Sequence, residues 1–269
     1  MTARAAGTVR IWHFAPLGLT VLIAFFLSAP VLLSILTGLM ANQFQGLTAG
    51  LTLRWVEEVI AQYHGAIRLS VWIACLTVLI DLVLGVLLAH GLRRMRTSWA
   101  RVLEEMFVMP VAMPGISLGL AMIVCYGALG GFRTHWSFIL VGHVLFTLPF
   151  MMRAVLAVMQ AQGLDLLEEA ASSLGAGPWR RLIDVVIPNC RSGLVAGALM
   201  VFTLSIGEFN MTLLLHSPFT PTLPVGLADA YASLRIEVGS AYTLIFFVLI
   251  VPLLIAMQVL GRSERSAAQ

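Results

Sequence analysis

Residues 168–181 read "EEAASSLGAGPWRR", a short charged segment between two strongly apolar ones. Its alanines suit a helix, and its Gly-Ala-Gly-Pro sequence interrupts that helix. Apolar residues at i, i+3, i+4 and i+7 share one helical face, and here they are Leu167, Ala170, Ala171 and Leu174. The segment therefore predicts two short helices that meet at an elbow lined by small residues.

The boundaries of these two helices can also be predicted. Asp165 followed by Glu168 resembles a capping box, which predicts that the first helix begins at residue 165 or 166. Gly175 suits the left-handed residue that follows a helix. Pro178 suits the first position of the second helix, which we expect to run to Pro188.

The composition is that of a membrane protein. Of the 269 residues, 59% are hydrophobic and 11% are charged, whereas about a quarter of the residues of a soluble domain carry charge. The mean hydropathy is +0.95. Apolar runs near the ~20 residues needed to cross a bilayer predict an all-α protein with one transmembrane domain, 1–269, and a loop at 159–190. The six predicted spans are 14–36, 66–90, 105–127, 136–158, 192–215 and 239–260.

The arginines predict the orientation of the chain. All sixteen basic residues are arginine, and twelve of them lie in segments on the same side as the N-terminus. This bias places both termini and loop 159–190 in the cytoplasm. No clustered basic stripe indicates nucleic acid. The four arginines on the other side are Arg54, Arg68, Arg133 and Arg235.

The absence of lysine excludes several chemistries. A Walker A motif, a Schiff base and a Ser-Lys dyad each need a lysine, so any ATP chemistry has to come from another chain. The three cysteines are scattered and form no metal-binding pattern. We therefore expect no catalytic residue, cofactor or metal site in this chain.

Three polar residues within the spans are candidates for a solute path. His143 lies in span four, and Glu208 and Asn210 lie in span five. Ionisable groups inside a bilayer are costly and usually face protein or water. Each candidate could instead make a structural hydrogen bond between helices. In span three, Pro110 and Pro114 predict a bend.

The loop resembles a known family signature. Glu169-Ala170-Ala171, Gly175 and Pro188 stand at the spacing of the EAA motif of binding-protein-dependent ABC importer permeases, with Val185 and Ile187 in place of isoleucine and leucine. The resemblance, over about residues 66–260, implies the type I fold of a bacterial inner-membrane protein. It also implies that the loop is a coupling helix contacting an ATPase, through Glu168, Glu169, Ala170, Ala171, Leu174, Gly175, Pro178, Arg180 and Arg181.

The same resemblance implies the partners. They are a dimer of ABC ATPase subunits that binds ATP and Mg²⁺, a second and different permease subunit, and a periplasmic or lipid-anchored solute-binding protein. Residues 205–231, "SIGEFNMTLLLHSPFTPTLPVGLADAY", resemble permeases of the polyamine (spermidine/putrescine), iron(III) and aminoethylphosphonate group. We therefore expect a small polar solute, a polyamine or a similar cation.

Two alternatives from other classes remain open at this point. Residues 115–119 match the GxSxG pattern, so Ser117 with His143 as base would suit an intramembrane serine protease. That pattern lacks the strand–turn–helix context that gives it meaning in soluble enzymes. The other alternative is a secondary transporter that needs no ATPase, against which stand the EAA spacing and the lack of an internal repeat.

Overall fold

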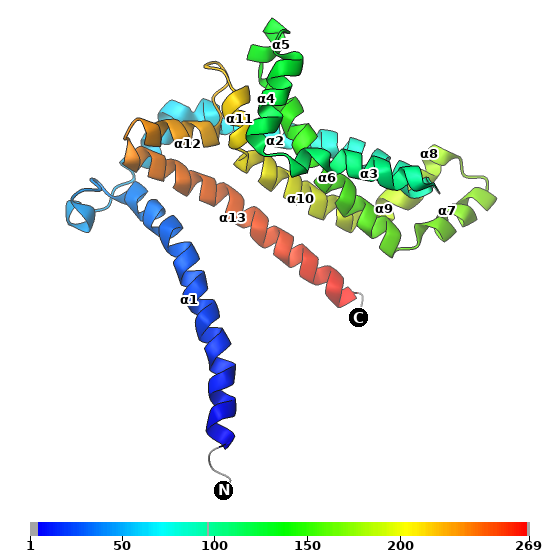
Figure 1. The fold of residues 1–269 in the computed structure, drawn as a ribbon, viewed down its shortest axis with the longest axis horizontal. Coiled ribbons are helices and arrows are strands. Elements are labelled where there is room, and N and C mark those ends of the chain that lie inside the picture. The colour runs from blue at the N-terminus through cyan, green and yellow to red at the C-terminus, as the bar shows by residue number, and fades with distance from the viewer. Residues whose placement is uncertain (1–4, 96, 268–269) are drawn as a thin grey trace. The chain divides into compact units, whose positions relative to one another are not determined.

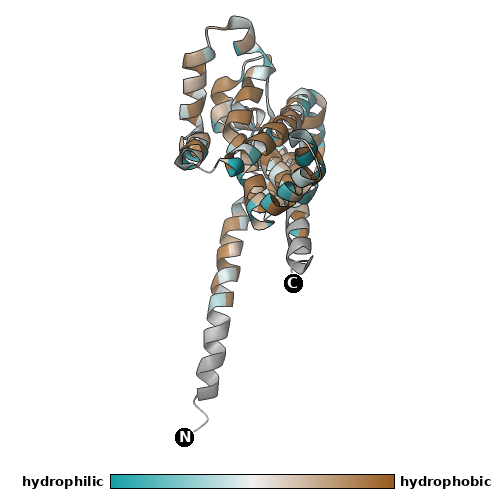
Figure 2. Ribbon diagram, turned by 90° about the vertical axis from the view of Figure 1, so that its right-hand side faces the viewer, coloured by the Kyte–Doolittle hydropathy of each residue, from teal (hydrophilic) through white to brown (hydrophobic). Residues whose placement is uncertain are grey.

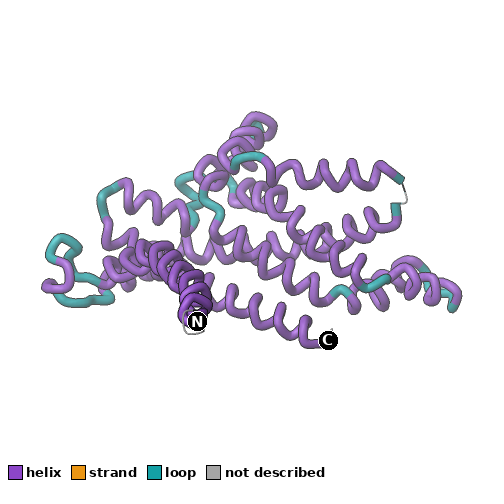
Figure 3. The backbone as a smooth tube through the Cα atoms, turned by 60° about the horizontal axis from the view of Figure 1, so that its bottom comes forward, coloured by secondary structure: helices purple, strands orange, loops and turns teal. Residues whose placement is uncertain are grey.

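The computed structural model describes the backbone of residues 5–95 and 97–267. This part of the chain is helical, and its only extended pairing is an isolated bridge between Met40 and Leu51 (Figure 3). The all-α prediction is confirmed. The elements are α1 (Ala5–Leu39), η1 (Gly46–Ala49), α2 (Arg54–Arg94), α3 (Ser98–Ala112), α4 (Gly115–Tyr126), α5 (Gly130–Thr134), α6 (Trp136–Ala161), α7 (Leu164–Ser173), α8 (Pro178–Arg181), η2 (Leu182–Val186), α9 (Ile187–Asn189), α10 (Arg191–Gly207), α11 (Asn210–Leu215), α12 (Leu223–Ala232) and α13 (Ile236–Ala267).

Several of these helices are long and apolar enough to cross a membrane. Four segments qualify within the described chain, and the number rises to six if each of two sharply bent helix pairs forms one span. Figure 2 shows apolar residues along much of the helical surface. The single segments are Pro16–Leu39, Arg54–Arg94, Trp136–Ala161 and Ile236–Ala256, and the bent pairs are Trp99–Ala112 with Gly115–Tyr126 and Pro178–Asn189 with Arg191–Gly207.

The predicted bend in span three is a complete break. α3 and α4 meet at an angle of 104°. Met113 has extended backbone angles (φ −88°, ψ 138°), because the ring of the following Pro114 disfavours the helical conformation at the residue before it. Pro110 lies inside the last turn of α3 without ending the helix.

Span five, predicted as one helix over 192–215, is broken near its end. α10 stops at Gly207, and Glu208 adopts extended angles (φ −71°, ψ 118°) before α11 begins at Asn210. The break coincides with the hydrogen bonds that Glu208 makes, described below.

The chain divides into two compact units, Met1–Ala61 with Asp229–Ile245 and Gln62–Ala228 with Phe246–Gln269. In the first unit, Arg235 forms an ion pair with Glu58 at the start of α2, and the Glu237 carboxylate accepts a hydrogen bond of 3.0 Å from the Gln43 backbone N–H. These bonds tie the two sequence segments of the unit together.

The second unit holds the loop and the polar residues of interest. α6 and α10 lie side by side in it (Figure 1). A Cβ atom on Gly193 would come within 2.8 Å of the Ala154 carbonyl oxygen, so only glycine permits this approach. Around this contact a buried apolar cluster includes Met151, Val155 and Val201. The unit thus has a packed core between α2, α6 and α10.

Candidate functional site

The EAA loop, residues 159–190, contains two helical segments around a glycine turn. α7 ends at Ser173, and Gly175 has φ 85°, the left-handed conformation predicted for it. A side chain at this φ is strained even though the space around Gly175 is open. Pro178 is the first residue of α8, also as predicted. The elbow between the two segments is therefore fixed by backbone conformation.

The predicted capping box is wrong. α7 begins at Leu164, its N-cap is Gly163, and no side chain caps it. Asp165 and Glu168 both bind the guanidinium of Arg93 instead. A charge-assisted bond to arginine is stronger than a bond to a neutral backbone N–H. The two carboxylates therefore pair with Arg93 of α2 and do not cap the N-terminus of α7.

The second helical segment ends at Asn189, one residue after the predicted end at Pro188. Pro188 does not stop it, because helical turns continue through the π-type turn Leu182–Val186 and α9 to Asn189. The chain then bends by 74° into α10. A single π turn inside a helix often marks a functional site.

Arg93 joins the EAA loop to the last turn of α2. Its Nη1 atom lies 2.5 Å from Asp165 Oδ1, and its Nη2 atom bonds to Glu168 Oε1. The side chains of Arg93 and Glu168 are each only 6% exposed, whereas that of Asp165 is 72% exposed. His90 Nδ1 and Arg94 Nη2 each lie 3.7 Å from a Glu168 oxygen. Buried charges are retained where they are paired in this way.

Apolar side chains hold the loop on the same unit. Leu164, Leu182 and Val186 of the loop are buried in one cluster with Leu92 of α2 and Met159 of α6. Burial of each such side chain contributes about 1.5–3 kcal/mol. The ionic contact of Arg93 therefore lies beside a packed interior.

The loop also carries exposed apolar side chains. Leu174 is 89% exposed and Trp179 is 68% exposed, and Leu166 and Leu167 are exposed as well. Ala170 is exposed, and Ala171 is half-buried. Exposed apolar side chains gathered on a charged loop are typical of a protein-binding surface.

The remaining charged residues of the motif have separate positions. Glu169 is exposed. Arg180 pairs with Asp184 one turn later, at 3.5 Å between Nε and Oδ2. Arg181 is half-buried, and its Nε atom has no hydrogen-bond partner among the described residues. Of the two glutamates, Glu169 is thus the one available to a partner protein.

A second polar cluster lies around the break in span five. Glu208 accepts hydrogen bonds of 2.8 Å from the backbone N–H groups of Met211 and Thr212 and one of 2.6 Å from the Thr212 hydroxyl. These bonds cap the first turn of α11. Glu208 therefore shapes its own segment of chain.

His143 extends this cluster into α6. Its Nδ1 atom lies 2.7 Å from the Ser205 hydroxyl, and its Nε2 atom lies 2.9 Å from the Thr212 hydroxyl. Because the Thr212 proton goes to Glu208, Thr212 has to accept from Nε2–H, which leaves Nδ1 to accept from Ser205. The network thus assigns one neutral tautomer to His143.

The three predicted path residues are only partly brought together. His143 and Glu208 are linked through Thr212, whereas Asn210 is exposed at the start of α11. Sequence reasoning missed Thr212 and Ser205, since a hydroxyl in a span carries no signal by itself. Nearby, Asp81 accepts a bond of 2.6 Å from Thr147.

The structure gives no support to a Ser117–His143 protease pair. Ser117 lies in the exposed first turn of α4. His143 is buried, and both of its ring nitrogens have other partners. A general base has to reach the proton that it removes.

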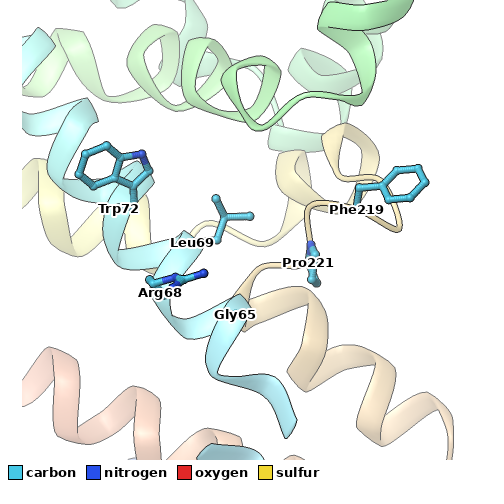
Figure 4. Close-up of a pocket in the computed structure, with 6 residues that line it drawn as sticks. All are labelled: Gly65, Arg68, Leu69, Trp72, Phe219 and Pro221. Carbon is cyan, nitrogen blue, oxygen red and sulfur yellow. The ribbon is translucent and has the colours of Figure 1, made fainter.

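A pocket of about 540 Å³ opens at the other end of this unit (Figure 4). Its walls come from one face of α2 and from the segment between α11 and α12. Within the described chain, no acidic side chain pairs with the guanidinium of Arg68, the one charged group in the pocket wall. The volume is within the ~300–1,000 Å³ typical of small-molecule sites. The lining residues are Gly65, Arg68, Leu69, Trp72, Phe219 and Pro221.

Curated relatives share most of the chain. PhnV of Salmonella paratyphi A, named as a permease protein of a 2-aminoethylphosphonate transport system, is 29% identical over 241 residues, which are 88% of this chain and 89% of the relative. CysW of Synechocystis, a sulfate transport system permease protein, is 26% identical over 212 residues, 74% of this chain and 76% of the relative.

A solved structure shares the fold. The chain of a bacterial ABC transporter involved in the import of the acidic polysaccharide alginate superposes with a TM-score of 0.69 at 14% identity, over 98% of this chain and 99% of that one. Residues 81–266 match the family model described as the binding-protein-dependent transport system inner membrane component. The chain is therefore a member of that family, a permease subunit of an ABC importer with the type I fold.

Proposed function

We propose that this permease imports a small solute carrying a tetrahedral oxyanion, and that Arg68 contacts the solute at the outer mouth of the path. The observation that carries the solute class is the guanidinium of Arg68, which faces the pocket without an acidic partner in the described chain. Guanidinium matches the geometry of phosphonate and sulfate oxygens and binds them with two parallel hydrogen bonds.

The relatives support an anionic class. Two of them are named for 2-aminoethylphosphonate and for sulfate, and both solutes carry a tetrahedral group with negatively charged oxygens. The polyamine expected from the sequence has no support among them. A polyamine would also be repelled by Arg68, because both carry positive charge.

We propose that the EAA loop lies in the cytoplasm and docks a separate ATPase dimer, which binds ATP and Mg²⁺, since the chain has no lysine for a Walker A motif. The exposed side chains of Leu174 and Trp179 supply an apolar contact, and Glu169 supplies a charge at its edge. A second permease subunit and a solute-binding protein complete the assembly.

Transport by the reconstituted complex tests the solute class. The permease is co-purified with the proteins encoded beside its gene and placed in vesicles. ATP hydrolysis is then measured with 2-aminoethylphosphonate, sulfate or spermidine, each with the binding protein. We expect one of the two oxyanions to stimulate hydrolysis and to accumulate in the vesicles. Stimulation by spermidine alone would contradict the proposal.

A variant of Arg68 tests the site itself. Removing a hydrogen bond to a charged group costs about 1.5–3 kcal/mol, so Arg68→Gln should lower uptake of the stimulating oxyanion by at least about 10-fold. Arg54→Gln is the matched control, because Arg54 begins α2 and stacks on Trp55, outside the pocket. Equal uptake by the two variants would remove Arg68 from the path.

A further inference from the structure

The contact between Arg93 and the EAA loop joins two parts of the chain that no short connection links. Arg93 lies at the end of α2, whereas Asp165 and Glu168 lie 72 and 75 residues later. The loop continues directly into α6 on one side and α10 on the other. Motion of the loop can therefore reach α6 and α10 through the backbone, but it reaches α2 only through side chains.

We infer that Arg93 is a positioning residue of transport, which makes α2 move with α7 when the ATPase moves the EAA loop. The inference rests on the proposed docking of an ATPase at this loop. Asp165 and Glu168 are one helical turn apart, so they lie on the same face of α7. One planar guanidinium binds both carboxylates, and this fixes the distance and the direction of α7 relative to the end of α2.

The surroundings favour a rigid joint. The side chains of Arg93 and Glu168 are almost fully buried, and Arg94 adds a positive charge 3.7 Å from Glu168. Water cannot easily replace either partner there, so separation of the pair would leave two buried charges without compensation. Leu174 and Trp179, the exposed apolar side chains that we assign to the ATPase, take no part in the Arg93 contact.

A joint and a purely structural pair predict different results. A structural pair would matter for assembly alone, and every complex that assembled would behave normally. A joint predicts complexes that assemble and hydrolyse ATP while α2 no longer follows α7. Coupling of two sites through such an element typically changes an equilibrium by about 5–150-fold.

Pulsed electron paramagnetic resonance can measure the distance between the end of α2 and α7, and this distance measurement needs no known solute. Nitroxide labels are placed through Gly91→Cys, in open space near the end of α2, and Ser172→Cys, exposed on α7. The complex is first freed of its native cysteines, including the exposed Cys75 and Cys125. The distance between the labels is recorded without nucleotide and after trapping with ATP and vanadate.

We expect the distance distribution to stay the same in both states when Arg93 is present. In Arg93→Gln we expect it to shift and broaden after trapping, and uptake per ATP hydrolysed should fall about 10-fold. Arg101→Gln, an exposed arginine of α3, is the matched control and should behave as the unmodified complex. The double variant Arg93→Gln with Glu168→Gln should be no worse than Arg93→Gln alone.

Three outcomes separate the possibilities. An unchanged distribution and unchanged uptake per ATP in assembled Arg93→Gln complexes would overturn the inference. If the Arg93→Gln variants fail to assemble, Arg93→Lys is used instead, because lysine keeps the charge but cannot bind two carboxylates through one planar group. An unchanged distance distribution in Arg93→Lys complexes would then also overturn the inference. If the unmodified permease binds no ATPase at all, the proposed docking fails instead, and that result is visible before any variant is made.

Discussion

Glu168 and Glu208 are two carboxylates in the same compact unit, and they have different structural roles. Glu168 binds Arg93, which lies 75 residues away, and so joins two helices. Glu208 binds backbone and hydroxyl groups three and four residues away, and so shapes one short stretch of chain. Glu168, whose partner is distant in sequence, connects two elements, whereas Glu208, whose partners are its neighbours, caps one.

Removal of Glu168 is expected to have the largest effect on stability. Glu168→Ala leaves the buried guanidinium of Arg93 with only the exposed Asp165 as partner, and we expect unfolding of the detergent-solubilised permease to become easier by about 3 kcal/mol. Asp165→Ala is the matched control and should cost less than about 1 kcal/mol, because its side chain is exposed. Equal costs for the two variants would contradict the assignment of Glu168 as the main partner.

The next effect is expected at the elbow of the loop. Gly175→Val forces a β-branched residue into the left-handed conformation, at a cost of about 1–2 kcal/mol, and should abolish transport-coupled ATP hydrolysis in a permease that still inserts. Gly175→Asn should retain most of the coupling, since asparagine tolerates this conformation. Normal coupling in Gly175→Val would show that the elbow need not keep its shape.

Glu208 should show a smaller and local effect. Glu208→Ala removes the cap of α11, and we expect a loss of about 1 kcal/mol in the free energy of unfolding. Glu208→Gln keeps one acceptor oxygen and should lose less. Measurement of uptake in parallel sharpens the comparison, because a large loss of uptake in a stable Glu208→Gln permease would give Glu208 a role in the solute path instead.

The smallest effect is expected on the loop surface. Arg180 and Asp184 form an exposed pair one turn apart, and Arg180→Ala should change the unfolding free energy by only about 0.3 kcal/mol. If ATPase association, measured by co-purification, falls in this stable variant, Arg180 belongs to the docking surface. If association is unchanged, its predicted contribution to docking is wrong.

The local features of the EAA loop could be predicted from sequence. Gly175 and Pro178 have the expected conformations because each residue type strongly restricts its own backbone. The capping box failed for a tertiary reason, since its two acids bind Arg93. A pattern of residues three apart cannot show that a charge from another helix competes for them.

The apolar segments could be located from the sequence, but the places and angles at which they bend or break could be predicted only in part. The bend at Pro114 follows from proline, although its angle of 104° does not. The break at Glu208 depends on donors on α11 and on His143 from α6. The pocket at Arg68 needs two segments about 150 residues apart, which periodicity alone does not bring together.

Site-specific photo-cross-linking at Leu174 shows whether the EAA loop docks an ATPase. A photoreactive residue is placed at Leu174, which is 89% exposed on the loop, or at Phe219 in the Arg68 pocket as control, in cells that express the neighbouring genes. We predict that Leu174 cross-links to the ATPase subunit and that Phe219 does not. Adducts of Leu174 with lipid alone, in cells where the ATPase is present, would contradict the account.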